Sequence, residues 1–102
     1  ADLQISPDGR FVYVSNRGVD NIVVFEIDPQ HHKLKFSGKY PSGGAHPRSI
    51  GMDQKGAYLF VLNRNSDQFL VFERNQRDGS LRQTEISAHV PGAVAIVQLF
   101  LD

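Results

Sequence analysis

The sequence contains neither cysteine nor tryptophan among its 102 residues. The absence of cysteine excludes disulfide bonds, thiolate metal sites and a cysteine nucleophile. Eleven basic and eleven acidic side chains leave no net charge, which argues against a nucleic-acid binder and against a polybasic membrane-surface module. The longest apolar stretch, residues 93–101, is too short to span a bilayer. We therefore expect neither nucleic acid nor membrane as a partner.

The sequence is made up largely of short apolar runs separated by glycine and proline. Nine glycines and five prolines are spread along the chain and leave little room for long helices. The runs are rich in β-branched and aromatic residues, as is typical of strands; they cover residues 11–14, 22–25, 58–62 and 69–72. None alternates cleanly between polar and apolar residues, so we expect strands that are buried on both faces in stacked sheets. The sequence predicts an all-β fold.

An internal repeat organises the chain. A shift of 47 residues aligns residues 3–34 with residues 50–81 without a gap, so that Gly9 meets Gly56 and Asn16-Arg17 meets Asn63-Arg64. Tandem four-stranded units of this length are typical of β-propeller blades. We expect one blade at residues 1–47, a second at 48–91, and a closing inner strand of a further blade at 92–102. A plain edge strand is the alternative for the last segment.

Eight strands are predicted within the two units, at residues 3–6, 11–15, 22–27 and 34–39, and at 49–53, 58–62, 69–74 and 81–87. The turn Pro7-Asp8-Gly9 joins the first two, because glycine supplies the positive φ that hairpin closure needs. The chain opens in the middle of a strand pattern and does not begin with Met. We therefore expect it to be a fragment of a larger propeller.

The motif Ile-Ser-Pro-Asp-Gly-Arg-Phe-Val-Tyr-Val-Ser-Asn-Arg-Gly at residues 5–18 resembles the penultimate repeat of the lactonase-type seven-bladed β-propellers. That family contains 6-phosphogluconolactonases and fungal carboxymuconate-lactonising enzymes. Residues 46–48 and 63–67 resemble the next repeat, and residues 90–94 resemble the closing strand. The Gly-His and Trp-Asp pattern of WD40 propellers is absent, which disfavours that class. The resemblance implies two blades plus one strand of a seven-bladed ring.

Four residues are candidates for substrate binding: Asn16, Arg17, His46 and Arg48. Strand alternation in an up-and-down blade places them on one face, and an arginine fork suits a carboxylate or phosphate. The resemblance implies a site without metal or cofactor, with Arg17 at the position of a catalytic arginine. It could also stabilise charge on a lactone carbonyl oxygen. The family's catalytic histidine and glutamate belong to earlier blades, and no residue here matches them.

Each candidate also has a plainer interpretation. Arg17 could pair with Asp20 across its loop, Arg48 could bind backbone carbonyls, and His46 could be an ordinary loop residue. The adjacent pair His31-His32 cannot bind a metal without other ligands. We therefore predict no metal site.

Two classes of function remain. The first is a fragment of a cytoplasmic sugar-lactone hydrolase that, as the resemblance implies, hydrolyses 6-phosphogluconolactone to 6-phosphogluconate; a carboxymuconate-lactonising cyclase is the alternative enzyme. The second is a non-catalytic propeller used as an interaction scaffold, because this fold hosts many functions. The expected partners are a small lactone and either the remaining blades of the propeller or copies of the chain itself. The 102-residue chain alone is expected to be inactive, because no agent for proton transfer is present.

Overall fold

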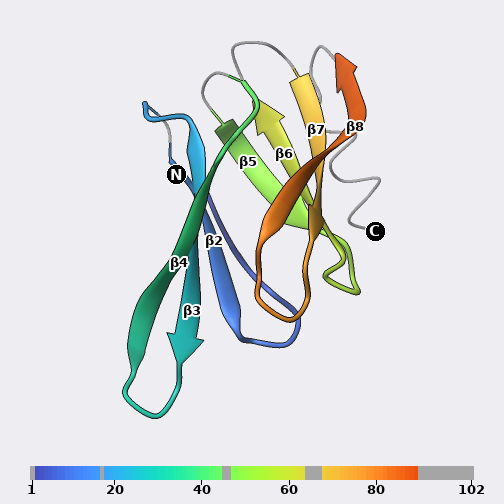
Figure 1. Cartoon of the computed structure of the whole chain (residues 1–102). Coiled ribbons are helices and arrows are strands. Elements are labelled where there is room, and N and C mark those ends of the chain that lie inside the picture. The colour runs from blue at the N-terminus through green and yellow to red at the C-terminus, as the bar shows by residue number, and fades with distance from the viewer. Residues whose placement is uncertain (1, 17, 45–46, 64–67, 90–102) are drawn as a thin grey trace.

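The computed structural model describes residues 2–16, 18–44, 47–63 and 68–89, and all regular structure within them is β-sheet. Eight strands form two four-stranded antiparallel sheets, with the strands of each sheet in chain order (Figure 1). In these residues no helix is long and apolar enough to cross a membrane. The predicted all-β fold is confirmed; the strands of the first sheet lie within residues 3–41 and those of the second within residues 47–89.

The first sheet comprises β1 (Leu3–Ile5), β2 (Phe11–Asn16), β3 (Asn21–Asp28) and β4 (Lys33–Pro41). The turn between β1 and β2 closes at Gly9, whose φ of 72° is in the left-handed region that glycine tolerates. Ser6 and Asp8 fix the same turn, because the Ser6 oxygen accepts from the Gly9 N–H and the Asp8 carboxylate accepts from the Arg10 N–H. These local interactions set the register of the hairpin.

The second sheet comprises β5 (Pro47–Met52), β6 (Tyr58–Asn63), β7 (Gln68–Arg74) and β8 (Leu81–His89). Most strands begin or end one or two residues from the predicted limits. The outer strands β4 and β8 are longer than predicted, and the register of each against its neighbour shifts at a bulge or irregularity. Such shifts bend a strand and increase its twist, and sequence patterns do not reveal them. The predicted closing strand, residues 92–102, lies outside the described residues.

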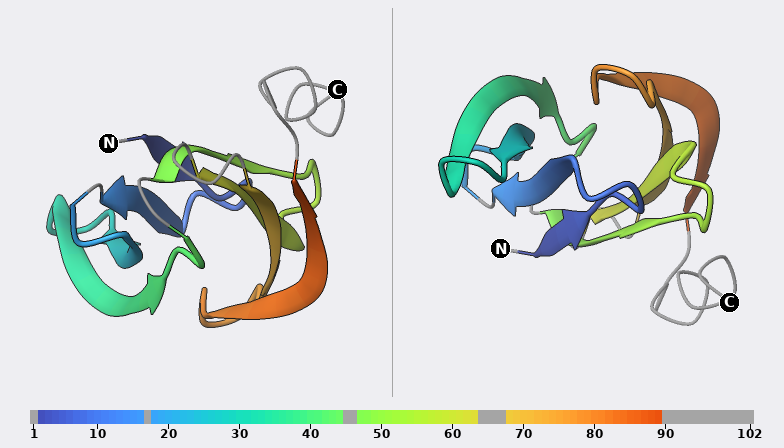
Figure 2. Two further views of the ribbon diagram at one scale, coloured as in Figure 1. Left: turned by 90° about the horizontal axis from the view of Figure 1, so that it is seen from above. Right: turned by 90° about the horizontal axis from the view of Figure 1, so that it is seen from below.

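The two sheets pack face to face, and the main core lies between them (Figure 2). Alternate residues of β2 and β3 in the first sheet, and of β5, β6 and β7 in the second, face this core. From the first sheet they are Phe11, Tyr13, Ile22 and Val24, and from the second they are Ile50, Met52, Leu59, Val61, Leu70, Phe72 and Leu81. The outer face of the second sheet carries a smaller cluster of Phe60, Phe69 and Val71. Sheets stacked in this way are the arrangement of neighbouring propeller blades.

Burial on both faces, predicted for all the central strands, is found in the second sheet more fully than in the first. In β3 the alternate residues Val23, Phe25 and Ile27 are only half-buried. The prediction, made for the apolar run 22–25, is therefore wrong for Val23 and Phe25, because in the described part of the chain no second layer covers the outer face of the first sheet.

A buried arginine links the two sheets at the end with the β1–β2 turn. Arg74, which is 4% exposed, donates from Nε to the Tyr13 hydroxyl at 2.6 Å and from Nη1 to the Gly56 oxygen at 2.9 Å. The Tyr13 hydroxyl donates to the Gly79 oxygen at 2.8 Å. The guanidinium lies 5.5 Å from the ring centroids of both Phe11 and Tyr13, within range of a cation–π interaction. Hydrogen bonds therefore compensate much of the cost of burying this charge.

Candidate functional site

The predicted site residues belong to one end of the two sheets. Strands β2, β4 and β6 end there, and β3, β5 and β7 begin there (Figure 1). The connections that contain residues 17–20, 42–46 and 64–67 therefore leave the sheets at this end, as the sequence predicts. The β1–β2 turn and the β3–β4 and β7–β8 hairpins lie at the opposite end.

The structure places two of the four candidates. Asn16 is the last residue of β2 and is half-buried; its backbone oxygen accepts from the Asp20 N–H at 2.9 Å. Arg48 lies in β5 at a register shift, since Pro47 pairs with Asn63 and Ser49 pairs with Leu62. Bulges of this kind are over-represented next to active sites, where they re-aim a side chain.

Arg17, His46 and the side chain of Arg48 lie outside the described residues. The roles predicted for Asn16, Arg17, His46 and Arg48 therefore stay predictions. Asp20 has a φ of 58°, and its backbone oxygen accepts from the Ser42 N–H at 3.0 Å. Asp20 thus joins the β2–β3 turn to the β4–β5 connection.

A buried amide organises the start of the β4–β5 connection. Asn63, at the end of β6, is fully buried, and its Nδ2 donates to the Ser42 backbone oxygen at 3.1 Å. The buried Ser42 hydroxyl donates to the Gly44 oxygen at 2.8 Å. These bonds tie the connection between the sheets to the second sheet, so the backbone that leads to residues 45–48 starts from a fixed point.

Asn63 is not among the four candidates for substrate binding that the sequence suggests. The 47-residue repeat pairs it with Asn16, and this equivalence is the signal that could have identified it. What the repeat cannot show is burial: Asn16 is half-buried whereas Asn63 is fully buried. The difference arises because the β4–β5 connection approaches Asn63.

Asp2 joins the innermost strands at the same end. Its backbone N–H donates to the Ser15 hydroxyl at 2.7 Å, and its carboxylate accepts from the Ile50 N–H at 2.9 Å. The second bond crosses from the first sheet to β5 of the second. The first strands of the two sheets, β1 and β5, are therefore fixed to one another beside the candidate site.

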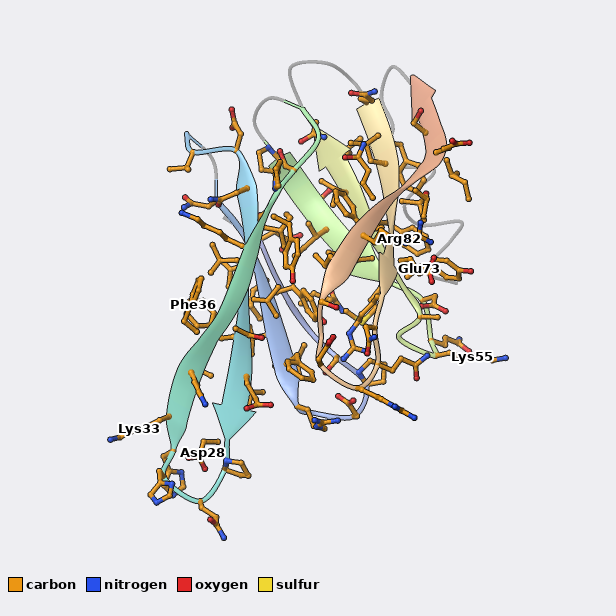
Figure 3. The ribbon with its side chains drawn as sticks, in the orientation of Figure 1. Asp28, Lys33, Phe36, Lys55, Glu73 and Arg82 are labelled. Atoms are coloured by element: carbon orange, nitrogen blue, oxygen red, sulfur yellow. The ribbon has the colours of Figure 1, made fainter. Side chains whose placement is uncertain are left out.

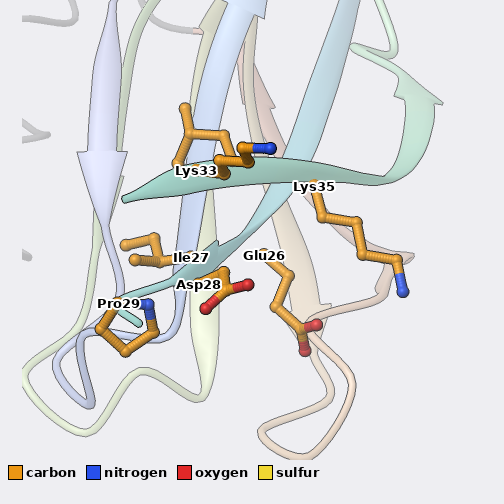
Figure 4. Close-up of a pocket in the computed structure, with 7 residues that line it drawn as sticks. Glu26, Ile27, Asp28, Pro29, Lys33 and Lys35 are labelled. Atoms are coloured by element: carbon orange, nitrogen blue, oxygen red, sulfur yellow. The ribbon is translucent and has the colours of Figure 1, made fainter. Parts of the chain in front are cut away.

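A hollow of about 570 Å³ opens at the opposite end, on the β3–β4 hairpin (Figure 4). Its charged lining residues oppose each other in register, Glu26 across from Lys35 and Asp28 across from Lys33. The acids and bases balance, so the hollow does not favour an anion. A hydrogen bond from His31 holds the pKa of Asp28 below its ordinary value. Across the described residues, no group of three or more histidines and carboxylates could hold a metal ion.

Comparison with known proteins gives the family. Residues 1–98 match the family model described as Lactonase, 7-bladed beta-propeller. A Formosa agariphila protein named 6-phosphogluconolactonase is 39% identical over 102 residues, which cover 98% of this chain and 29% of that protein. A Bacillus subtilis protein of the same name is 33% identical over 94 residues, which cover 92% of this chain and 27% of that protein.

A solved structure agrees with these relatives. The periplasmic gluconolactonase of Pseudomonas aeruginosa superposes with a TM-score of 0.82 at 38% identity, covering 86% of this chain and 24% of that one. The chain thus spans less than a third of the length of the proteins it resembles. The family match, the two stacked sheets and the 47-residue repeat agree, and the chain belongs to the lactonase family of seven-bladed β-propellers.

Proposed function

We propose that the chain is part of a sugar-lactone hydrolase that converts 6-phosphogluconolactone to 6-phosphogluconate. The observation that carries this proposal is the 39% identity, over nearly the whole chain, to a protein named 6-phosphogluconolactonase. This substrate is a cyclic ester that carries a negatively charged phosphate. The candidate site belongs to the end of the sheets where Arg17 follows β2 in the sequence and Arg48 lies near the start of β5.

In this mechanism water attacks the lactone carbonyl carbon, the bond from that carbon to the ring oxygen breaks, and the ring oxygen leaves as a hydroxyl. Arg17 binds the phosphate or stabilises the negative charge that develops on the carbonyl oxygen. Asn16, His46 and Arg48 contribute to substrate binding. The groups that move protons belong to blades outside residues 1–102, because none of the chain's residues matches the family's catalytic histidine or glutamate.

A chimera tests the proposal. Residues 1–102 replace the matching segment of the Formosa agariphila protein, and hydrolysis of 6-phosphogluconolactone, unphosphorylated gluconolactone and carboxymuconolactone is compared. We expect the phosphorylated lactone to have the highest kcat/KM. The 102-residue chain alone should not exceed the hydrolysis rate in buffer. Preference for carboxymuconolactone would favour the cyclase, and a folded chimera inactive on all three lactones would contradict the proposal.

We also propose that the intact protein is located in the cytoplasm. The cytoplasmic location expected from the sequence differs from that of the Pseudomonas aeruginosa relative, which is described as periplasmic. Fractionation of cells that express the intact protein, with marker enzymes for each compartment, would distinguish the two.

A further inference from the structure

The turn between β7 and β8 fits against the first sheet because it contains a glycine. Gly79 has a φ of 76°, and a Cβ on it would lie 2.6 Å from the Phe11 ring. The Gly79 oxygen accepts from the Tyr13 hydroxyl at 2.8 Å. The lack of a side chain at residue 79 therefore lets this turn approach a large aromatic residue of the neighbouring sheet.

The β3–β4 turn of the first sheet has the same hydrogen-bond pattern but a different residue at that position. The 47-residue repeat pairs His32 with Gly79, and His32 also has a positive φ, of 51°. In each turn one side-chain oxygen, from Asp28 or from its equivalent Asn75, accepts from two backbone N–H groups. The first sheet thus carries an exposed imidazole at the position where the second sheet carries a glycine.

The β3–β4 turn continues into the outer face of the first sheet, which no second layer covers among the described residues. Exposed residues of this face have buried equivalents in the second sheet: Leu3 corresponds to Ile50, Ile5 to Met52 and Leu34 to Leu81. Those equivalents lie in the core between the two sheets. The outer face of the first sheet therefore corresponds to the face by which the second sheet contacts the first.

A second position distinguishes the two faces. Arg74, whose Nε donates to the Tyr13 hydroxyl at 2.6 Å, corresponds to Ile27 in the first sheet. Isoleucine has no donor for a hydroxyl. The sheet that packs on this face in the same geometry therefore needs neither the tyrosine nor the large aromatic residue that the first sheet presents to the second.

We propose that His32 selects the blade that covers the first sheet, by admitting one with a small residue where the first blade has Phe11. The occupant is another blade of the intact protein, since the chain spans less than a third of the length of its relatives. A second copy of the chain fits less well in this geometry. Its second blade would bring Tyr58, the equivalent of Phe11, against His32, and two large side chains cannot share that space without displacement.

A three-blade chain tests the proposal. A copy of residues 1–47 is placed before the 102-residue chain, which keeps the 47-residue period, and the copy carries Tyr13→Phe because Ile27 stands opposite that position. The sequence has no tryptophan, so Phe36→Trp in the 102-residue part provides a single fluorescent reporter on the outer face of the first sheet (Figure 3). Its emission wavelength and its quenching by acrylamide show whether the added blade covers that face.

The residues at positions 11 and 32 are then varied together. With His32 retained, a copy that carries Phe11→Ala should cover the face, so that emission moves to shorter wavelength and quenching falls about threefold as the aromatic ring is buried. A copy that keeps Phe11 should leave both readings as they are without a copy. His32→Gly in the 102-residue part should let the copy with Phe11 cover the face. The control, His32→Gly without an added copy, should change neither reading.

Equal coverage by the two copies on the chain with His32 would overturn the selection. Coverage by no copy on either chain would overturn the docking geometry. If Phe11→Ala unfolds the added blade, the two chains whose copy keeps Phe11 still decide, because only the one with His32→Gly should show coverage. A shift that appears only at high protein concentration would identify a second copy as the occupant, and this result would also overturn the proposal.

Discussion

Arg17 is the residue on which the proposed chemistry depends most. In the active chimera, Arg17→Ala should raise the transition-state free energy by roughly 2–4 kcal/mol, the range for losing one oxyanion-type contact. Arg17→Lys should recover only part of the loss, because an ammonium cannot reproduce the planar fork. Steady-state kcat/KM for 6-phosphogluconolactone measures both effects. If Arg17→Ala has the same kcat/KM as the unmodified chimera, Arg17 has a structural role only.

Tyr13 contributes to the stability of the fold, not to the proposed chemistry. Its hydroxyl accepts from Arg74 and donates to the Gly79 oxygen, and burial raises the pKa of Tyr13 above its ordinary value of 10.0. Tyr13→Phe removes the partner of the Arg74 Nε–H and of the Gly79 oxygen, and bonds to charged groups contribute about 1.5–3 kcal/mol. Urea unfolding should show a loss of that size. The half-exposed Tyr58 provides the control, since Tyr58→Phe should change the free energy of unfolding by less than about 0.5 kcal/mol.

At the scale of elements, the β7–β8 turn is shaped by the neighbouring sheet. Gly79 has a φ of 76°, and a Cβ on it would lie 2.6 Å from the Phe11 ring, whereas Gly9, with a φ of 72°, has open space around it. Alanine at either position pays the left-handed backbone cost, about 1–2 kcal/mol. Only Gly79→Ala adds a steric clash, which should cost about 1–3 kcal/mol more.

Urea unfolding of Gly79→Ala beside Gly9→Ala measures that difference directly. Equal midpoints and slopes for the two variants would mean that the turn can move away from Phe11 without cost.

The strands could be predicted from the sequence because each apolar run ends at turn residues whose chemistry is local. Gly9 and its repeat equivalent Gly56 both have a φ of 72°, which a single sequence can anticipate. Arg74 could not be anticipated: its partner Tyr13 lies 61 residues away, and a charged residue at a strand end is usually solvated. The same limit applies to the site, where the burial of Asn63 depends on a connection that comes from the other sheet.

At the scale of the whole molecule, the outer face of the first sheet is apolar, and no second layer covers it among the described residues. Leu3, Ile5, Leu34 and Phe36 are each more than half exposed, and Phe36 projects from β4 away from the second sheet (Figure 3). The 47-residue repeat explains this face, since Leu3 and Ile5 correspond to Ile50 and Met52, which lie in the core between the sheets. The outer face of the first sheet is therefore a surface of the kind that packs against another blade.

Such a face drives association when it is left in water. We expect the 102-residue chain to associate at micromolar concentration, with copies of itself or with other blades when these are supplied. Phe36→Glu places a charge on this face, on its edge strand β4, and should shift sedimentation equilibrium toward smaller species. Gln30→Glu, in the exposed β3–β4 turn, adds the same charge away from the face and should leave association unchanged. A monomeric wild-type chain that unfolds cooperatively would contradict this prediction, because two blades would then be stable without a neighbour on that face.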